Sequence, residues 1–250
     1  MNGEGAAIEI RDLCKRFGEN EVLKGISLRV EHGSTTVILG ASGSGKSVLI
    51  KHVIGLLRPD SGEIWIEGEA IAQAGERRLN EVRRKFGMVF QGAALFDSMT
   101  VGENVAFPLR EHLSLSEREI RAIVTEKLNL FGLFGVEDKY PAELSGGMRK
   151  RVGLARAIVL NPGMILYDEP TTGLDPIATE NVNGMIVEAR EKLQVTSVVI
   201  SHDIGAAFAV ADAIAVLHDG RIVEYGAPAA VRASEHPHVR QFLSTWFSRV

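Results

Sequence analysis

Short runs of β-branched and apolar residues divide this chain, and stretches with helical spacing of hydrophobic residues lie between them. Residues 7–13 alternate between apolar and polar, which is typical of a half-buried β-strand. Residues 35–39 form an uninterrupted run that predicts a strand buried on both faces. Asp219-Gly220 separates two strand-like segments and is a strong hairpin signal. The predicted strands are 7–13, 26–30, 35–39, 63–68, 87–90, 164–167, 198–200, 213–217 and 221–225.

Helical spacing appears over 48–57 and becomes dominant after Gln91. Ser116 and Glu119 form a capping box that predicts a helix over 120–131, with Gly132 as its C-terminal stop. We therefore expect an α/β chain with a helical insert. Its parts are an α/β core over 7–91 and 161–226, an inserted helical subdomain over 92–160 and a C-terminal tail over 227–250.

Composition and charge narrow the class of protein and the kinds of partner that this chain can have. The chain has 250 residues, of which 45% are hydrophobic and 24% charged, as is ordinary for a globular protein with a substantial core. Its net charge of −4 argues against a nucleic-acid partner. The single cysteine, Cys14, suits a reducing cytoplasm, and the first five residues show no secretory signal. The longest uncharged apolar stretch, 157–167, is too short to span a bilayer, so we expect any membrane role to depend on a partner.

The clearest chemical motif is Gly40-Ala41-Ser42-Gly43-Ser44-Gly45-Lys46-Ser47, which lies between a predicted strand and a predicted helix. In this setting the pattern predicts a phosphate-binding loop. The glycines let backbone N–H groups turn toward a polyphosphate, and the helix N-terminus adds its dipole. We expect Lys46 to reach the terminal phosphates and the Ser47 hydroxyl to hold Mg²⁺. The alternative, a simple glycine-rich turn, does not explain why lysine and serine follow it.

Two further motifs carry candidate chemistry. Asp168-Glu169 ends a buried strand, so we expect Asp168 to organise Mg²⁺ and Glu169 to polarise an attacking water. The alternative is a pair of solvated loop acids. Ser145-Gly146-Gly147 begins an Arg-rich helix and forms a second candidate anion site, although by itself it is also an ordinary N-cap. Two such sites suggest that one ATP lies between two copies of the chain.

Six motifs occur in the order found in ABC-transporter ATPases, and the chain resembles that family from about residue 7 to residue 226. They are Gly40–Ser47 (Walker A), Gln91 (Q-loop), Leu144–Met148 (signature), Asp168-Glu169 (Walker B), Gly173-Leu174-Asp175-Pro176 (D-loop) and Ser201-His202-Asp203 (switch histidine). The resemblance implies the α/β P-loop NTPase fold of ABC ATPases, with a RecA-like core, an antiparallel β subdomain and an inserted helical subdomain. It implies an ATPase that uses ATP and Mg²⁺. A P-loop small-molecule kinase, an alternative, leaves the signature and His202 unexplained.

The resemblance also implies a role for each motif residue. Phe17 resembles the aromatic residue that stacks on adenine, and its alternative is a core phenylalanine. Glu169 is the expected base, and His202 is expected to hold the γ-phosphate and the attacking water. Gln91, the third expected catalytic residue, is expected to touch Mg²⁺ or the attacking water and to sense a transmembrane partner. The implied ATP ligands are Phe17, Gly40, Ala41, Ser42, Gly43, Ser44, Gly45, Lys46 and Ser47 in one copy, and Ser145, Gly146, Gly147 and Asp175 in trans; the Mg²⁺ ligands are Ser47, Gln91 and Asp168.

Within the family, residues 89–112 are similar to those of Mla/Mce-type phospholipid-transport ATPases, most clearly over 92–96 and 105–112. That resemblance implies a cytoplasmic, peripheral subunit on the inner membrane, working as a homodimer beneath transmembrane permease subunits. A periplasmic MCE lipid-binding protein and a small STAS-domain protein are the further partners it implies. The alternatives are the ATPase of an amino-acid or methionine importer, and a soluble non-transport ABC protein. The latter usually has two cassettes or a long coiled coil, whereas this chain shows one cassette and no heptad run.

Overall fold

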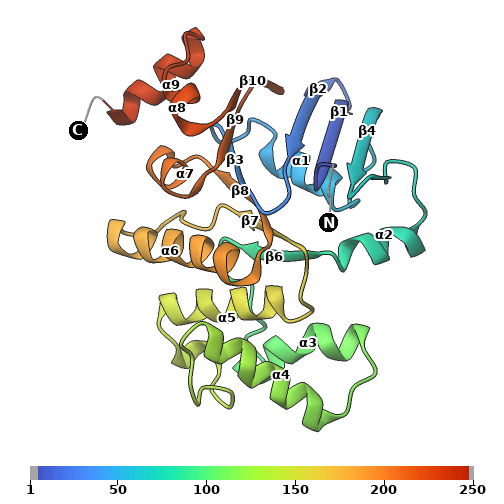
Figure 1. Ribbon diagram of the computed structural model, residues 1–250, viewed down its shortest axis with the longest axis vertical. Helices are drawn as coiled ribbons and strands as arrows, with labels where there is room; N and C mark the ends of the chain where they lie inside the picture. The colour runs from blue at the N-terminus through green and yellow to red at the C-terminus, as the bar shows by residue number, and fades with distance from the viewer. Residues whose placement is uncertain (1–4, 248–250) are drawn as a thin grey trace.

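The computed structural model describes residues 5–247 and is drawn in Figure 1. The first four residues, and the last three residues of the expected tail, lie outside the described part. The larger sheet consists of β3 (Thr35–Leu39), β6 (Phe86–Phe90), β7 (Met164–Asp168), β8 (Thr196–Ser201), β9 (Ala213–His218) and β10 (Arg221–Gly226). Their spatial order is β10-β9-β3-β8-β7-β6, and within this sheet only β10 runs antiparallel to its neighbour.

The second sheet is antiparallel. It consists of β1 (Ile8–Phe17), β2 (Asn20–Val30), β4 (Ser61–Ile66) and β5 (Glu69–Ala70), in the order β2-β1-β4-β5. One hydrophobic cluster joins this sheet, the parallel sheet and α1 (Lys46–Val53), with Ile64, Ile38 and Leu49 among its buried members. The expected fold, an α/β P-loop core with an antiparallel β subdomain, is confirmed.

The parallel sheet has a second core on its other face. Val37 and Leu39 of β3 belong to this cluster, whereas Ile38 between them belongs to the first. Successive side chains of a strand point to opposite faces, so a strand buried on both faces must be apolar throughout. All five residues of β3 are buried, which confirms the sequence prediction for 35–39.

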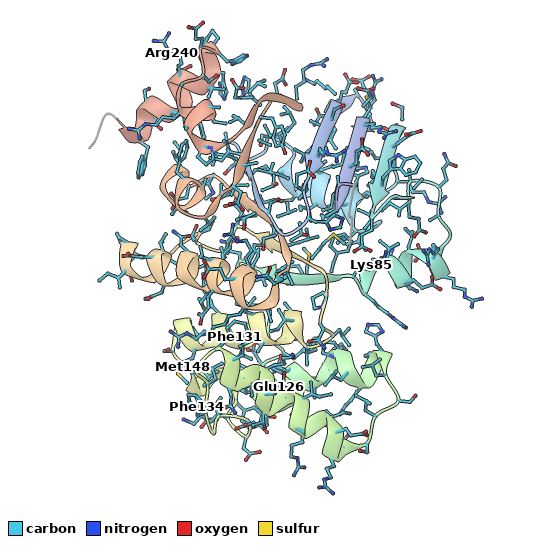
Figure 2. The ribbon with its side chains drawn as sticks, viewed as in Figure 1. Lys85, Glu126, Phe131, Phe134, Met148 and Arg240 are labelled. Atoms are coloured by element: carbon cyan, nitrogen blue, oxygen red, sulfur yellow. The ribbon has the colours of Figure 1, made fainter. Side chains whose placement is uncertain are left out.

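Helices surround the larger sheet (Figure 1). Three of them, α3 (Val101–His112), α4 (Glu117–Leu130) and α5 (Gly146–Ile158), follow β6 and precede β7. Their core includes the buried Phe131, and Met148 packs against this core (Figure 2). The domain boundaries at 92 and 160 stay a prediction. The other helices are α2 (Glu76–Arg83), η1 (Pro141–Glu143), α6 (Pro176–Leu193), α7 (Ile204–Val210), α8 (Pro228–Arg232) and α9 (Pro237–Phe247).

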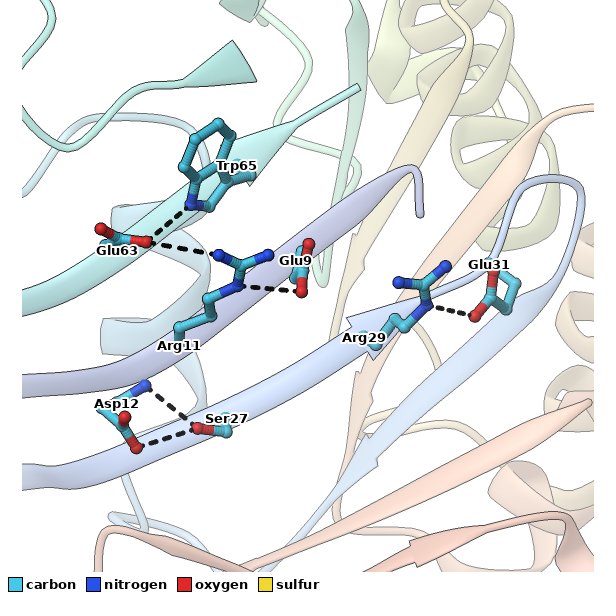
Figure 3. A network of polar contacts seen from close by, with 8 residues as sticks. All are labelled: Glu9, Arg11, Asp12, Ser27, Arg29, Glu31, Glu63 and Trp65. Atoms are coloured by element: carbon cyan, nitrogen blue, oxygen red, sulfur yellow. Dashed lines mark hydrogen bonds and ion pairs between the residues drawn. The ribbon is translucent and has the colours of Figure 1, made fainter. Parts of the chain in front are cut away.

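The exposed face of the antiparallel sheet is covered by a polar network (Figure 3). Arg11 contacts Glu9 at 3.0 Å and Glu63 of the neighbouring strand at 3.7 Å. The Trp65 indole N–H donates to Glu63 at 3.0 Å, and the Arg11 guanidinium stacks over the Trp65 ring. Cross-strand pairs of this kind stabilise a sheet face exposed to water, and they explain the apolar–polar alternation at the start of the chain.

The structure departs from the sequence prediction at several elements, three of them next to the candidate motifs. The first strand, predicted over 7–13, extends to Phe17, which pairs with Asn20 because Gly18 (φ 59°) allows a tight two-residue turn. The first helix ends at Val53 rather than at residue 57, since Gly55 adopts φ 65°. The 18-residue helix α6 has no counterpart among the predicted elements.

The C-terminal helix α9 packs on the core, to which it contributes the buried Val239 and Leu243. The indole of Trp246 lies against Gly205 of α7, where an added Cβ would come within 2.8 Å of the ring. The side chain of Phe247 lies outside the described part of the chain. No helix within residues 5–247 is both long enough and apolar enough to cross a membrane.

Candidate functional site

Four candidate segments meet at one edge of the parallel sheet. Strand register pairs Leu39 with Ser201, Ile200 with Asp168, and Asp168 with Phe90. The phosphate loop, His202, Glu169 and Gln91 therefore follow neighbouring strand ends at the same level. Ligands of open α/β sheets bind at the carboxyl ends of the strands. The candidate site lies at such an edge.

The phosphate loop has the backbone conformation that its glycines permit. Gly43 and Gly45 have φ values of 81° and 104°, which strain other residue types. Gly40 is packed closely, because a Cβ there would lie 2.4 Å from the Leu217 carbonyl oxygen. The loop encloses a cavity of about 330 Å³ with Ser42, Gly43, Gly45, Lys46, Ser47 and Glu169 in its lining.

The start of α1 is suited to an anion. Its N-cap, Gly45, provides no side-chain cap, so the first N–H groups of the helix have no side-chain acceptor there. By contrast, a side chain caps α3, α4, α5, α6 and α7. The Ser44 hydroxyl is buried without a hydrogen-bond partner in the described structure. Uncapped N–H groups and an unsatisfied hydroxyl fit phosphate oxygens.

Lys46 brings its charge into this cavity from a side chain that is only 5% exposed. Its ammonium donates to the carbonyl oxygens of Gly40 at 2.7 Å and Ala41 at 3.0 Å. The third neighbour is a carboxylate oxygen of Glu169, at 3.4 Å. The loop backbone therefore fixes the ammonium beside the strongest candidate base.

Glu169 is the point at which three motifs meet. Its carboxylate contacts Lys46, accepts a hydrogen bond from the Thr172 hydroxyl at 2.9 Å, and contacts His202 Nδ1 at 2.6 Å. Because an ionised carboxylate only accepts, the histidine donates from Nδ1, and Nε2 is left for another partner. The backbone at Glu169 has φ 50°, a left-handed conformation that is uncommon for this residue type. Such local strain is typical of functional sites.

Asp168, Ser47 and Gln91 were predicted to hold Mg²⁺. Asp168 is the half-buried last residue of β7, Ser47 is exposed in the first turn of α1, and Gln91 directly follows the strand paired with β7. Burial, and secondarily the neighbouring Glu169 charge, raise the pKa of the Asp168 carboxyl. A carboxylate, a hydroxyl and an amide oxygen suit this hard cation, so the donor set fits the ion.

The signature residues lie apart from the phosphate loop of the same chain. Gly146 and Gly147 line a different cavity of about 670 Å³, together with Gln91, Thr172 and Asp175. Ser145 caps α5 by accepting from the Met148 N–H at 3.2 Å, and Asp175 caps α6 by accepting from the Ala178 N–H at 2.8 Å. The structure therefore does not bring the two anion motifs of one copy together.

Phe17 lies at the tip of the β1–β2 hairpin, and its side chain is 46% exposed. It is not a core phenylalanine. Val22 of the same hairpin lies beside Gly45 of the phosphate loop, whereas Phe17 does not line the cavity of that loop. Sequence reasoning missed Thr172, whose bond to Glu169 joins the two cavities; the only available signal was its position shortly after Asp168-Glu169.

This fold and this arrangement of loop, lysine and carboxylates define a P-loop nucleoside triphosphatase. The family described as "ABC transporter" matches residues 23–172. The chain therefore belongs to the ABC transporter family, and its fold is that of the ATPase cassettes.

Two named relatives are similar over nearly the whole chain. A probable ribonucleotide transport ATP-binding protein, mkl of Mycobacterium leprae (strain TN), is 45% identical over 96% of this chain and 69% of its own. The intermembrane phospholipid transport system ATP-binding protein MlaF of Escherichia coli (strain K12) is 42% identical over 94% of this chain and 88% of its own.

Two solved structures of ABC transporter proteins have the same fold as this chain. The structure of cbiO1 from Clostridium perfringens, part of the ABC transporter complex cbiONQ, has a TM-score of 0.85 at 31% identity and covers 98% of this chain and 97% of its own. A dimeric structure of the ATP-binding cassette MJ0796 bound to ADP and Pi has a TM-score of 0.78 at 32% identity, over 88% of this chain and 98% of its own.

Proposed function

We propose that this chain is the ATP-hydrolysing subunit of an ABC transporter that moves phospholipid at the bacterial envelope. The observation that supports ATP hydrolysis most directly is the contact of Glu169 with both Lys46 and His202 beside the phosphate loop. The identity to proteins named for intermembrane phospholipid transport supports the lipid substrate.

In the proposed reaction, Lys46 and the loop N–H groups bind the β- and γ-phosphates. Glu169 accepts a proton as water attacks the γ-phosphorus, and the bond to the β–γ bridging oxygen breaks to release ADP and phosphate. His202 is already held by Glu169 through Nδ1. In a neutral ring that donates from Nδ1, Nε2 is an acceptor and can take a hydrogen bond from the attacking water, whereas a bond to a γ-phosphate oxygen requires a ring that carries both protons. Ser47, Asp168 and Gln91 would hold Mg²⁺, which would neutralise negative charge on the phosphates.

The proposed working unit is a head-to-tail homodimer. Ser145, Gly146 and Gly147 lie away from the Lys46 cavity of their own chain, which supports their use in trans. Although Ser145 accepts a hydrogen bond as the cap of α5, its hydroxyl hydrogen stays available to a phosphate oxygen. Asp175, at the start of α6, is placed to support the same contact. The dimeric cassette related to this chain supports this arrangement.

A groove of about 420 Å³ is the proposed docking site for a permease. Its aromatic lining includes Phe90, Phe96 and Phe107, which are 41%, 43% and 37% exposed. Arg83, Arg84 and Arg156 add positive charge, and none of the described lining residues is acidic. The groove therefore fits a short helix with an apolar anchor and a carboxylate. Such a partner would place the chain at the cytoplasmic face of the inner membrane.

The remaining proposed partners come from the lipid-transport relatives. We include a periplasmic MCE lipid-binding protein and a STAS-domain protein, and no nucleic acid. The mkl relative is named for ribonucleotide transport, so a ribonucleotide is the second candidate substrate.

Co-purification tests this proposal. The tagged chain is isolated from native membranes in mild detergent, and proteins and lipids are identified by mass spectrometry. A permease together with an MCE-domain protein and phospholipid is the expected result. A permease with an amino-acid-binding protein, or with bound ribonucleotide and no lipid, would keep the ATPase assignment and refute the lipid substrate. Absence of any membrane protein would favour the non-transport class.

A further inference from the structure

The second half of β1 is redirected by a bulge before it reaches Phe17. Asp12 has φ 48°, and the β1–β4 register shifts between Arg11 and Cys14. Gly62 permits close approach at this point, because an added Cβ would lie 2.4 Å from the Asp12 carbonyl oxygen. A bulge re-aims the residues that follow it. The direction of Phe17 therefore depends on what holds the segment after the bulge.

Asp60, in the turn before β4, holds that segment at three successive residues. Its N–H donates to the Cys14 carbonyl oxygen at 3.0 Å. Its carboxylate pairs with the Lys15 ammonium at 2.8 Å and accepts from the Arg16 N–H at 2.7 Å. These bonds, the lysine bond first, hold the pKa of the Asp60 carboxyl below its ordinary value. It is thus the ionised carboxylate of Asp60 that binds Lys15 and the Arg16 N–H of β1.

Lys15 contacts both Asp60 and the Phe17 ring. Its side chain is only 15% exposed, and its ammonium also donates to the Arg58 carbonyl oxygen at 2.9 Å. The same ammonium lies 5.5 Å from the centroid of the Phe17 ring, within the range of a cation–π contact. Because the cation occupies one face of the ring, a nucleobase can stack only on the opposite face.

We propose that Asp60 is a positioning residue for Phe17 and, through that ring, for the adenine base of ATP. The inference rests on the proposed function, in which Phe17 is the base-stacking residue. Asp60 touches neither phosphate nor base. It fixes the backbone on one side of Phe17 and the cation on one face of its ring, so the free face is presented to the nucleotide in a single orientation.

The test compares a ligand that has a base with one that lacks it. Dissociation constants of ATP and of inorganic tripolyphosphate are measured with Mg²⁺ for the wild type, Asp60→Ala, Asp60→Asn, Phe17→Ala and the Asp60→Ala/Phe17→Ala double variant. Removing a base–aromatic stack altogether typically costs about 5- to 150-fold in affinity. We expect Asp60→Ala to weaken ATP about three- to tenfold and to leave tripolyphosphate unchanged. Steady-state kinetics should show a raised KM with kcat retained.

The matched control is Glu117→Gln, which breaks an exposed ion pair with Arg110 (2.8 Å) between α3 and α4. Thermal unfolding of every variant separates positioning from loss of folding, and Asp60→Asn, which keeps one acceptor for the Arg16 N–H, should weaken ATP less than Asp60→Ala does.

The proposal would be overturned if the effect of Asp60→Ala on ATP affinity did not depend on Phe17. If Asp60 acts through the ring, Asp60→Ala adds no further loss in the Phe17→Ala background. Equal weakening of ATP and tripolyphosphate, or multiplication of the two losses, would refute the positioning role. Phe17→Ala without effect on ATP would refute the stacking assignment and this role with it. A wild type that binds neither ligand would instead refute the nucleotide site itself.

Discussion

Replacing Glu169 with glutamine tests the base in the proposed reaction. The substitution keeps the size of the side chain and can keep the φ of 50°, so it adds no new backbone strain. General-base catalysis contributes about 10²- to 10⁴-fold to the rate, which corresponds to roughly 2.7–5.4 kcal/mol of activation free energy. We expect ATP hydrolysis to fall by a factor in that range.

ATP binding should survive the same change. The lost negative charge lies 3.4 Å from the Lys46 ammonium and competes with phosphate for it. At an effective dielectric constant of about 20, two unit charges at this separation interact by roughly 5 kcal/mol. Solvation of both groups offsets most of this energy, so we expect ATP affinity to stay equal or to increase.

Two measurements check this prediction: phosphate release at saturating Mg·ATP, and equilibrium binding of ATP. The control is Glu188→Gln, which makes the same chemical change at a glutamate on α6 that contacts Lys192. Hydrolysis by Glu169→Gln at the wild-type rate would show that Glu169 is not the base. Loss of ATP binding would show that its charge is needed to place Lys46 rather than to activate water.

Three further substitutions test the phosphate contact of Lys46 and the packing of Gly40 and His52. Lys46→Ala should weaken ATP binding about 10- to 150-fold in equilibrium dialysis, because charged hydrogen bonds contribute about 1.5–3 kcal/mol; unchanged affinity would exclude the phosphate contact. Gly40→Ala should lower the free energy of unfolding by about 1–3 kcal/mol, since its Cβ would clash with the Leu217 carbonyl oxygen, whereas Gly184→Ala in open space on α6 should not destabilise. Burial lowers the pKa of His52 in the folded protein, so as the pH falls the imidazole is protonated in the unfolded chain before it is protonated in the folded one. The free energy of unfolding therefore decreases as the pH drops below about 6.5. The free energy of unfolding, measured with denaturant, should differ less between pH 5 and pH 7 for His52→Leu than for the wild type. An equal difference for the two proteins would contradict this reasoning.

The sequence was informative where chemistry restricts the residue type. Gly43 and Gly45 need positive φ and Lys46 needs a charge, so the phosphate loop could be located from its pattern. The buried strands were equally clear, because a strand with a core on both faces tolerates few polar residues. By contrast, α6 was missed even though Asp175 and Pro176 supply a cap and a first-turn proline for it.

The unpredicted parts of the site depend on tertiary contacts. No sequence pattern indicates that a glutamate adopts the left-handed conformation, as Glu169 does. Likewise, the hold of Asp60 on β1 depends on the bulge at Asp12, which is visible only in the strand register. The Glu169 carboxylate contacts His202, which is 33 positions away in the chain. In the same way, the segment before Phe17 is held by Asp60, which is more than 40 positions away.

The bond between Thr172 and Glu169 gives the two cavities a physical connection. Thr172 lines the cavity of the signature residues, whereas Glu169 lines the cavity of the phosphate loop. Their side chains meet at 2.9 Å, and the shared carboxylate also contacts His202 at 2.6 Å. A shift of the segment 172–175 when a second copy binds would therefore lengthen, break or re-aim a hydrogen bond to the carboxylate that is proposed to activate water. A homodimer that closes around ATP would thus both complete the phosphate site and set the orientation of its base, which joins hydrolysis to dimer formation through a single hydrogen bond.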